Sequence, residues 1–135
     1  DLASAIASAL EKFEGQTGIR TTFAQSSSGA PLAPEYVIQL LHIIQEALSN
    51  VRKHAQATQV DVVMEQDGDC RVFVTDNGKG FDSSPKTGVD EENHVGIKIM
   101  KERAHRIGAQ LAIASAPGEG TRVSLALTRQ PKGTA

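Results

Sequence analysis

The chain has 135 residues, a length that fits one domain built around one hydrophobic core. Its composition, 39% hydrophobic and 22% charged with a net charge of −2, is that of a globular chain and gives no reason to expect direct contact with nucleic acid. The single cysteine, Cys70, excludes an intrachain disulfide, and the sequence contains neither an apolar run of membrane-spanning length nor an opening signal peptide.

The first part of the chain predicts two helices with a strand between them. Residues 1–14 predict a helix that ends near Gly15, with apolar side chains repeating at helical spacing at Leu2, Ile6, Leu10 and Phe13. Residues 19–23 alternate and predict a short strand, and the Ser-, Gly- and Pro-rich residues 25–34 predict a loop. Residues 34–55 predict a long helix with a Pro-Glu start and an apolar stripe of Val37, Leu41, Ile44, Leu48, Val51 and Ala55.

The second part predicts two hairpins separated by a loop and a helix. Residues 58–66 and 69–76 predict strands joined at Asp67-Gly68, which is a hairpin signal. A second pair of strands is predicted at residues 110–115 and 121–128, followed by a frayed tail from Arg129.

Between the hairpins, the sequence changes from aperiodic to helical. Residues 81–94 contain Gly, Pro, Ser and acidic residues without periodicity and predict a mobile loop. Residues 95–107 predict a helix that ends near Gly108. Adjacent hairpins with helices on one face indicate an α/β (α+β) two-layer sandwich with a mixed, mostly antiparallel sheet, rather than a doubly wound parallel sheet. No repeat or boundary divides the chain, so residues 1–135 are expected to form a single domain.

The most informative motif follows the strand at residues 69–76 and reads Asp76-Asn77-Gly78-Lys79-Gly80-Phe81. A strand ending in Asp76 delivers one carboxylate, which can accept a hydrogen bond from an exocyclic amine. Gly78 and Gly80 would allow the backbone to approach a flat ligand closely. The alternative is a plain turn, because Asp-Asn-Gly is also a common turn sequence.

The long helix carries a polar ridge in addition to its apolar stripe. Glu46, Asn50 and His54 are spaced four residues apart and therefore lie in one row, with Lys53 beside it. An amide beside a carboxylate suits a hard cation that keeps most of its waters, and Lys53 and His54 could meet phosphate oxygens. The row therefore suits a nucleoside triphosphate, the alternative being an ordinary solvated face.

Two further positions can contribute to such a site. The predicted helix begins at His94-Val95-Gly96-Ile97, where free amides could meet phosphates and Gly96 would let them approach. Its alternative is a flexible connection with a glycine at its end. Gly120-Thr121 opens the last strand, and the Thr121 hydroxyl could form a hydrogen bond with an adenine ring or a water. The alternative is an ordinary tight turn before a strand.

Together, these segments resemble the ATP-binding catalytic domain of sensor histidine kinases, within the GHKL (Bergerat-fold) ATPase superfamily. The form of the motifs is most similar to the nitrate/nitrite-sensor (NarX-like) subfamily, and the resemblance covers residues 32–128. Four ordered segments carry it: residues 46–55, residues 76–81, residues 94–104 and residues 120–123.

The resemblance implies ATP and Mg²⁺ as cofactors. By position, Asn50 would bind Mg²⁺, Lys53 and His54 would approach the phosphates, and Gly96-Ile97 would form the phosphate-contacting start of the next helix.

At the other end of the implied site, Asp76 would receive the adenine amino group. Gly78 and Gly80 would let the base sit close, Thr121 would complete the adenine pocket, and residues 81–94 would be the ATP lid.

The resemblance further implies transfer of the ATP γ-phosphoryl group to a histidine on a separate dimerisation domain, then to a response regulator that binds DNA. His42 lies inside the long helix and is expected to be an ordinary surface histidine, so the phosphoacceptor must lie elsewhere. Such transfer relies on positioning and charge neutralisation. The isolated chain is therefore expected to bind Mg-ATP but to autophosphorylate little.

Three other functions share these features. One is an anti-sigma-factor serine kinase of the same fold, and another is a gyrase-type ATPase clamp in which Glu46 would activate water. In a kinase, by contrast, Glu46 would be a metal-shell or orienting residue. The third, a degenerate interaction module, is disfavoured by the intact motifs at Asn50, Asp76, Gly78, Gly80 and Gly96.

The chain starts at Asp1 without methionine and is expected to be an excised piece of a longer protein. We expect a cytoplasmic location, either in a cytoplasmic kinase or in the cytoplasmic part of a membrane-bound sensor. This piece itself is expected not to contact the membrane, and the full-length protein to be a homodimer.

Overall fold

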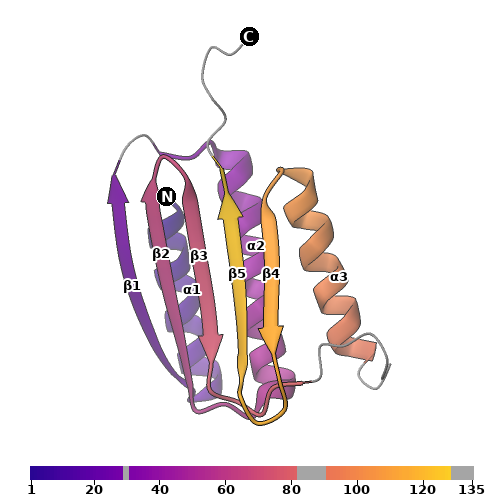
Figure 1. Cartoon of the computed structure of the whole chain (residues 1–135). Coiled ribbons are helices and arrows are strands. Elements are labelled where there is room, and N and C mark those ends of the chain that lie inside the picture. Colours follow the sequence, from indigo (N-terminus) through magenta and orange to yellow (C-terminus); the bar gives the residue numbers. More distant parts are fainter. Residues whose placement is uncertain (29–30, 82–90, 129–135) are drawn as a thin grey trace.

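The computed structural model describes residues 1–28, 31–81 and 91–128, and for residues 27–28 and 91–95 only the backbone. Helices α1 (Leu2–Thr17), α2 (Pro34–Asn50) and α3 (Glu91–Arg106) pack on a sheet, and a π-helical turn, η1 (Val51–Ala55), continues α2 (Figure 1). The strands are β1 (Arg20–Ser28), β2 (Gln59–Asp67), β3 (Cys70–Asp76), β4 (Gln110–Ser115) and β5 (Thr121–Leu127).

The sheet has the order β1-β2-β3-β5-β4, and all three helices lie on one of its faces (Figure 1). Strand β1 runs parallel to β2, and every other neighbouring pair is antiparallel. The parallel pair is possible because α2 and η1 form a long connection from β1 to β2, while the two hairpins need only tight turns. The predicted two-layer sandwich with a mixed, mostly antiparallel sheet is confirmed, and β2 to β5 begin and end within one residue of prediction.

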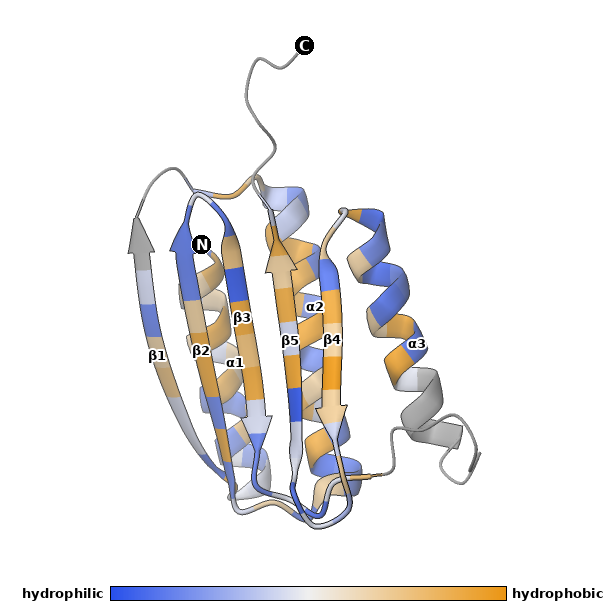
Figure 2. Ribbon diagram, viewed as in Figure 1, coloured by the Kyte–Doolittle hydropathy of each residue, from blue (hydrophilic) through white to orange (hydrophobic). Residues whose placement is uncertain are grey.

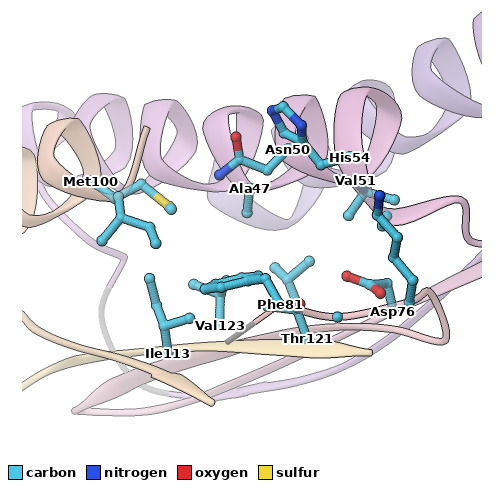
Figure 3. A pocket seen from close by; sticks show the side chains of 15 residues that line it. Ala47, Asn50, Val51, His54, Asp76, Phe81, Met100, Ile113, Thr121 and Val123 are labelled. Carbon is cyan, nitrogen blue, oxygen red and sulfur yellow. The ribbon is translucent and has the colours of Figure 1, made fainter. Parts of the chain in front are cut away.

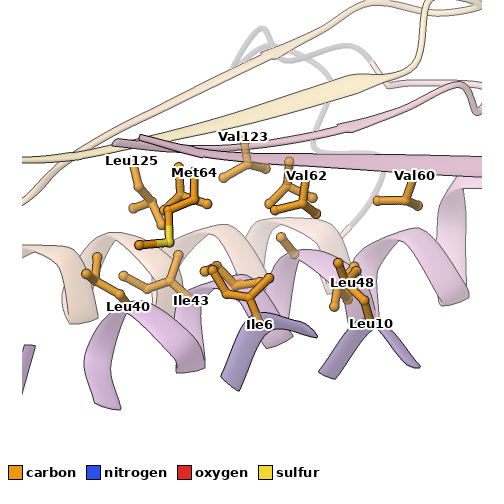
Figure 4. Packing of buried hydrophobic residues seen from close by; sticks show 14 of the residues in the cluster. Ile6, Leu10, Leu40, Ile43, Leu48, Val60, Val62, Met64, Val123 and Leu125 are labelled. Carbon is orange, nitrogen blue, oxygen red and sulfur yellow. The ribbon is translucent and has the colours of Figure 1, made fainter. Parts of the chain in front are cut away.

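The core lies between the sheet and the helices. Alternate strand residues point inward, so hydrophobic and hydrophilic residues are interspersed along the strands (Figure 2). Figure 4 shows Val60, Val62 and Met64 of β2 facing Ile6 of α1 and Ile43 of α2. Because α1 contributes to the same buried cluster as β5, the first helix is part of the core and not an appendage.

Helix α1 continues three residues beyond its predicted last residue. Gly15 remains helical, and the left-handed residue that ends the helix is Gly18, with φ +75°. Its N–H donates to the Glu14 carbonyl at 2.8 Å. The Thr17 hydroxyl donates to the Phe13 carbonyl, so side-chain bonding supports the extra turn.

Strand β1 is also longer than predicted and includes residues that were predicted to form a loop. Its serine-rich end pairs with β2 as far as Ser28 opposite Asp67. The backbone ladder to β2 therefore outweighs the loop-like composition, because its hydrogen bonds do not depend on the side chains. Residues 29–30 of that predicted loop lie outside the described residues.

The buried stripe of α2 differs from the predicted one. Val37 and Leu41 are only half-buried, whereas Leu40, Ile43 and Ala47 are buried together with the predicted Ile44 and Leu48. Helix α2 lies between α1 and α3 as well as against the sheet, so its covered side is wider than one stripe.

Helix α3 begins at Glu91, four residues before the predicted start, so Gly96 lies in its second turn. The free amides of the first turn therefore belong to residues 91–94 and not to Gly96. Glutamate is a good helix former and is favoured in a first turn, which explains why this acidic segment joins the helix. Residues 82–90 of the predicted lid and the tail from residue 129 lie outside the described residues.

Among the described residues, no helix combines the length and the apolar character that crossing a bilayer would require.

The burial of α2 predicts unequal effects for two isoleucines in one helix. Ile43 is 0% exposed and Ile38 is 51% exposed. Ile43→Ala should lower the free energy of unfolding by about 2–5 kcal/mol, because it removes buried contacts and leaves a cavity. Ile38→Ala, the control, should change it by about 0.5 kcal/mol or less. Urea unfolding followed by circular dichroism measures both, and equal losses would contradict the packing of α2.

Candidate functional site

A pocket lies between the end of α2 and the sheet. Figure 3 shows Ala47, Asn50, Val51 and His54 on the helical side, opposite Ile113, Thr121, Val123 and Asp76 on the sheet side. Helix α3 closes one side with Ile97 and Met100, and the segment after β3 closes another with Lys79, Gly80 and Phe81. The walls are mostly apolar, with Asp76 on the sheet side and Asn50 and His54 on the helical side.

Asp76, the last residue of β3, provides the buried charge of this pocket. Asp76 is 7% exposed, and among the described residues it is the only buried one with a polar or charged side chain. Its Oδ1 accepts a hydrogen bond from the Gly78 N–H at 2.8 Å. Burial raises the pKa of the carboxyl above its ordinary 3.8, and hydrogen bonds from the backbone N–H groups of Gly78 and Thr121 oppose that rise. The pocket therefore offers a strong, oriented acceptor.

Gly78 and Gly80 allow protein segments to approach each other closely. A Cβ at Gly78 would collide with the Ala55 carbonyl, and one at Gly80, which has φ +64°, would collide with the Ala116 carbonyl. The neighbouring Lys79 N–H donates to the Ala55 carbonyl at 2.7 Å, and the Lys79 carbonyl accepts from the Gly118 N–H at 2.6 Å. The missing side chains thus make room for backbone, where the sequence predicted room for a ligand.

The predicted polar ridge is divided by the structure. Asn50 and His54 are half-buried and line the pocket, so this part of the ridge faces a cleft. Lys53 is exposed and Glu46 is half-buried, and neither lines the pocket. The sequence did not predict the π-helical turn η1, which contains His54 and ends at Ala55. Such wide turns are frequent at functional sites, and this one presents the Ala55 carbonyl to Lys79.

Gly96 lies against Asn50 and not on the pocket wall. A Cβ at Gly96 would lie 3.0 Å from Asn50 Oδ1 and 3.2 Å from its Nδ2, tighter than most real contacts. The glycine therefore lets α3 pack directly on the Asn50 amide, and its neighbour Ile97 lines the pocket.

The described residues contain no cluster of three or more His, Cys, Asp or Glu that could hold a metal ion. A cation beside Asn50 would take one amide oxygen from the protein and its other ligands from water or a bound anion. This donor set suits Mg²⁺, which binds oxygen and usually keeps several waters.

Sequence reasoning missed the apolar walls and two polar residues. Inward strand positions and helix residues form the walls: Ala47, Val74, Met100, Ile113 and Val123. Lys79 is the missed polar residue of the lining, and Ser115 is a missed polar residue beside it, with its hydroxyl 2.8 Å from that of Thr121. Strand alternation could have placed Val74 and Val123, and hairpin register could have paired Ser115 with Thr121. An apolar slot with a buried carboxylate on the sheet side and an amide and an imidazole on the helical side suits a flat, amine-bearing ring with an anionic tail.

Known proteins resemble this chain over most of its length. Residues 35–131 match the profile of the histidine kinase-, DNA gyrase B-, and HSP90-like ATPases. The chain is 37% identical over 119 residues to the signal transduction histidine-protein kinase/phosphatase DegS of Brevibacillus brevis, covering 87% of this chain and 30% of DegS. It is also 37% identical over 127 residues to the nitrate/nitrite sensor protein NarQ of Escherichia coli, covering 93% of this chain and 22% of NarQ.

The fold also matches solved structures. The crystal structure of full-length ShkA in complex with AMPPNP superposes with a TM-score of 0.74 at 20% identity, covering 94% of this chain and 30% of ShkA. The chain thus spans less than a third of the length of each of these three proteins.

Two aspartates should affect stability with opposite pH dependence. The raised pKa of Asp76 means that its stabilising contribution is present below pH 3.8 and is lost as the pH rises through its folded pKa. Hydrogen bonds from Gln59 and Thr22 lower the pKa of Asp61, so its contribution is present above pH 3.8 and is lost as the pH falls through the folded value. Urea unfolding of Asp76→Asn and Asp61→Asn across acidic pH should therefore show difference curves of opposite slope. Slopes of the same sign would contradict the burial of Asp76.

Proposed function

The chain belongs to the family of histidine kinase-, DNA gyrase B-, and HSP90-like ATPases, and we propose that it is the ATP-binding catalytic domain of a two-component sensor histidine kinase. The observation that carries this proposal is the buried Asp76 carboxylate in a mostly apolar pocket between the sheet and α2. The relatives support the proposed kinase function, because DegS is by name a histidine-protein kinase/phosphatase and NarQ is by name a sensor protein.

The adenine ring binds at the Asp76 end of the pocket in this proposal. Asp76 has one oxygen bonded to the Gly78 N–H, and its carboxylate can accept from the adenine amino group. Val74, Val123 and Ile113 supply apolar surface for the ring faces. Gly78 and Gly80 act by allowing the tight backbone arrangement that holds Asp76, and Thr121 adds a hydroxyl beside it. That ShkA was solved with AMPPNP supports a nucleotide in this fold.

The phosphates extend along α2 toward Asn50 and His54. Asn50 would hold Mg²⁺, which when bound neutralises phosphate charge and orients the γ-phosphoryl group. His54 lines the pocket, and the exposed Lys53 on the same turn can reach phosphate oxygens outside it. Gly96 keeps α3 against the Asn50 amide and so helps to fix that ligand, while Ile97 contacts the nucleotide from α3. Glu46, one turn before Asn50, is proposed as an orienting residue.

The transfer step joins this domain to other parts of a longer protein. The γ-phosphoryl group goes to a histidine on a separate dimerisation domain, and from there to a response regulator that binds DNA. His42 is exposed on α2, away from the pocket lining, and is not the acceptor in this proposal. We further propose that the full-length protein is a homodimer and that this domain lies in the cytoplasm.

The relatives bear on the subfamily. The motifs of residues 46–55 and 94–104 favour the nitrate/nitrite-sensor group, and NarQ at 37% identity supports it. DegS matches at the same identity, which does not confirm the narrower assignment. We therefore propose the wider group that contains both, with a nitrate or nitrite stimulus as a hypothesis within it.

We also propose that residues 1–135 form a single domain. Helix α1 lies before the segment that matches the family, yet Leu2, Ile6, Leu10 and Phe13 pack in the same buried cluster as Val123 and Leu125.

Asp76→Asn should weaken the binding of Mg-ATP by roughly 10- to 150-fold, because a hydrogen bond to a buried charged acceptor contributes about 1.5–3 kcal/mol. Isothermal titration calorimetry of the parent chain and the variant measures this, with GTP as the control nucleotide.

Asp61→Asn is the matched control, because Asp61 alternates with the buried Val60 and Val62 and so lies on the other face of the sheet. This control should bind Mg-ATP like the parent chain. Parental affinity in folded Asp76→Asn would rule out adenine recognition by Asp76.

Asn50→Ala should reduce the dependence of ATP affinity on Mg²⁺. The parent chain is expected to bind ATP more tightly with Mg²⁺ than with a chelator, and in the variant this ratio should fall toward one. Gly96→Ala should act in the same direction, because its Cβ would press on the Asn50 amide. Gln45→Ala, at an exposed position of the same helix, is the control and should keep the parental ratio. An unchanged ratio in Asn50→Ala would exclude Asn50 as the metal ligand.

A further inference from the structure

Ser115 joins three chain segments beside the Asp76 end of the pocket, where the adenine base is proposed to bind. It is the last residue of β4 and lies opposite Thr121, the first residue of β5. Its hydroxyl accepts a hydrogen bond from the Phe81 N–H at 2.9 Å and donates to the Gly120 carbonyl at 3.0 Å. The Thr121 hydroxyl lies 2.8 Å away. One side chain thus links the segment after Asp76 to the turn that precedes β5.

The proton of Ser115 determines how Thr121 faces the pocket. When this proton is donated to the Gly120 carbonyl, the 2.8 Å bond must be donated by the Thr121 hydroxyl. Thr121 then has only lone pairs to offer to the pocket. Asp76 pairs with Thr121 in the sheet, and its carboxylate is also an acceptor. Two acceptors therefore lie side by side at this end of the pocket.

Two neighbouring acceptors distinguish between purines. Adenine carries an amino donor at the position where guanine carries a carbonyl acceptor. With the base oriented as proposed, so that its C6 substituent faces this pair, an amino group can donate to it, whereas the guanine carbonyl would leave acceptor facing acceptor. We propose that Ser115 is a positioning residue for base selection: it holds the Thr121 hydroxyl as an acceptor and anchors Phe81, the first residue after the Asp76–Gly80 motif. This inference rests on the proposed ATP-binding function.

Through its hydrogen bond to Phe81, Ser115 also positions part of the pocket wall. Phe81 lines the pocket, and Figure 3 shows its ring close to Val123 on the sheet side. Its backbone N–H is held by the Ser115 hydroxyl. Removal of that hydroxyl therefore releases both the orientation of Thr121 and the position of Phe81, while the phosphate end at Asn50 stays as it is.

Ser115→Ala should weaken the binding of ATP and of adenosine by the same factor, about three- to tenfold, as expected for loss of a hydrogen bond. Selectivity for ATP over GTP should fall, because the freed Thr121 hydroxyl can turn and donate to the guanine carbonyl. Titrations followed by amide chemical shifts measure these affinities even when binding is weak. Hydrogen exchange should accelerate at the Phe81 amide but not at the Gly78 amide, which Asp76 holds. Ser115→Thr keeps the hydroxyl and should restore selectivity.

Ser124→Ala is the matched control, since Ser124 lies on β5 between the buried Val123 and Leu125 and so points away from the pocket. It should bind both nucleotides like the parent chain. If Ser115→Ala does not fold, Ser115→Cys keeps the size of the side chain, forms weaker hydrogen bonds and should shift affinity and selectivity in the same direction.

Parental affinity and selectivity in folded Ser115→Ala, while the parent chain binds ATP, would overturn this inference alone. Failure of the folded parent chain to bind ATP would overturn the proposed function and this inference with it. A loss of ATP affinity with unchanged adenosine affinity would place the effect at the phosphates and would also overturn it.

Discussion

The site depends on burial of the Asp76 carboxylate at the end of a central strand. A buried carboxylate is costly unless its oxygens find donors, and here the backbone N–H groups of Gly78 and Thr121 supply them. Those donors are in place only because the chain turns sharply after β3 and meets the start of β5. Backbone contacts around one charged side chain therefore determine the geometry of the pocket.

Close backbone approach around Asp76 gives Gly78 and Gly80 a structural role of their own. The segment after β3 is bonded to Ala55 at the end of η1 on one side and to the turn before β5 on the other. At Gly78 and Gly80 a side chain would collide with these neighbouring carbonyls. The motif thus joins the helical wall of the pocket to the sheet wall, and the distance between the walls sets the width of the slot.

Helix α2 carries out two tasks, with different residues on different sides. Its buried residues, among them Ile43 and Leu48, attach it to the sheet, while Asn50 and His54 reach the pocket where the helix widens into η1. Helix α3 then packs on Asn50 through Gly96. The Asn50 amide, held between two helices in this way, has little freedom to reorient, which suits its proposed role as a cation ligand in phosphoryl transfer that relies on positioning.

The sequence by itself determined the strands of both hairpins, the two-layer class and most of the residues proposed to bind the nucleotide, because side-chain periodicity and turn chemistry are local properties. Tertiary structure alone decided the length of β1, the start of α3, the wide burial of α2 and the π-helical turn at His54. These depend on which segments meet: β1 is extended by its ladder to β2, and α2 is covered by neighbours on several sides. The link from Ser115 to Phe81 is of the same kind, since it joins positions 34 residues apart in the chain. Local pattern identifies which residues can act, and long-range packing determines which of them face each other.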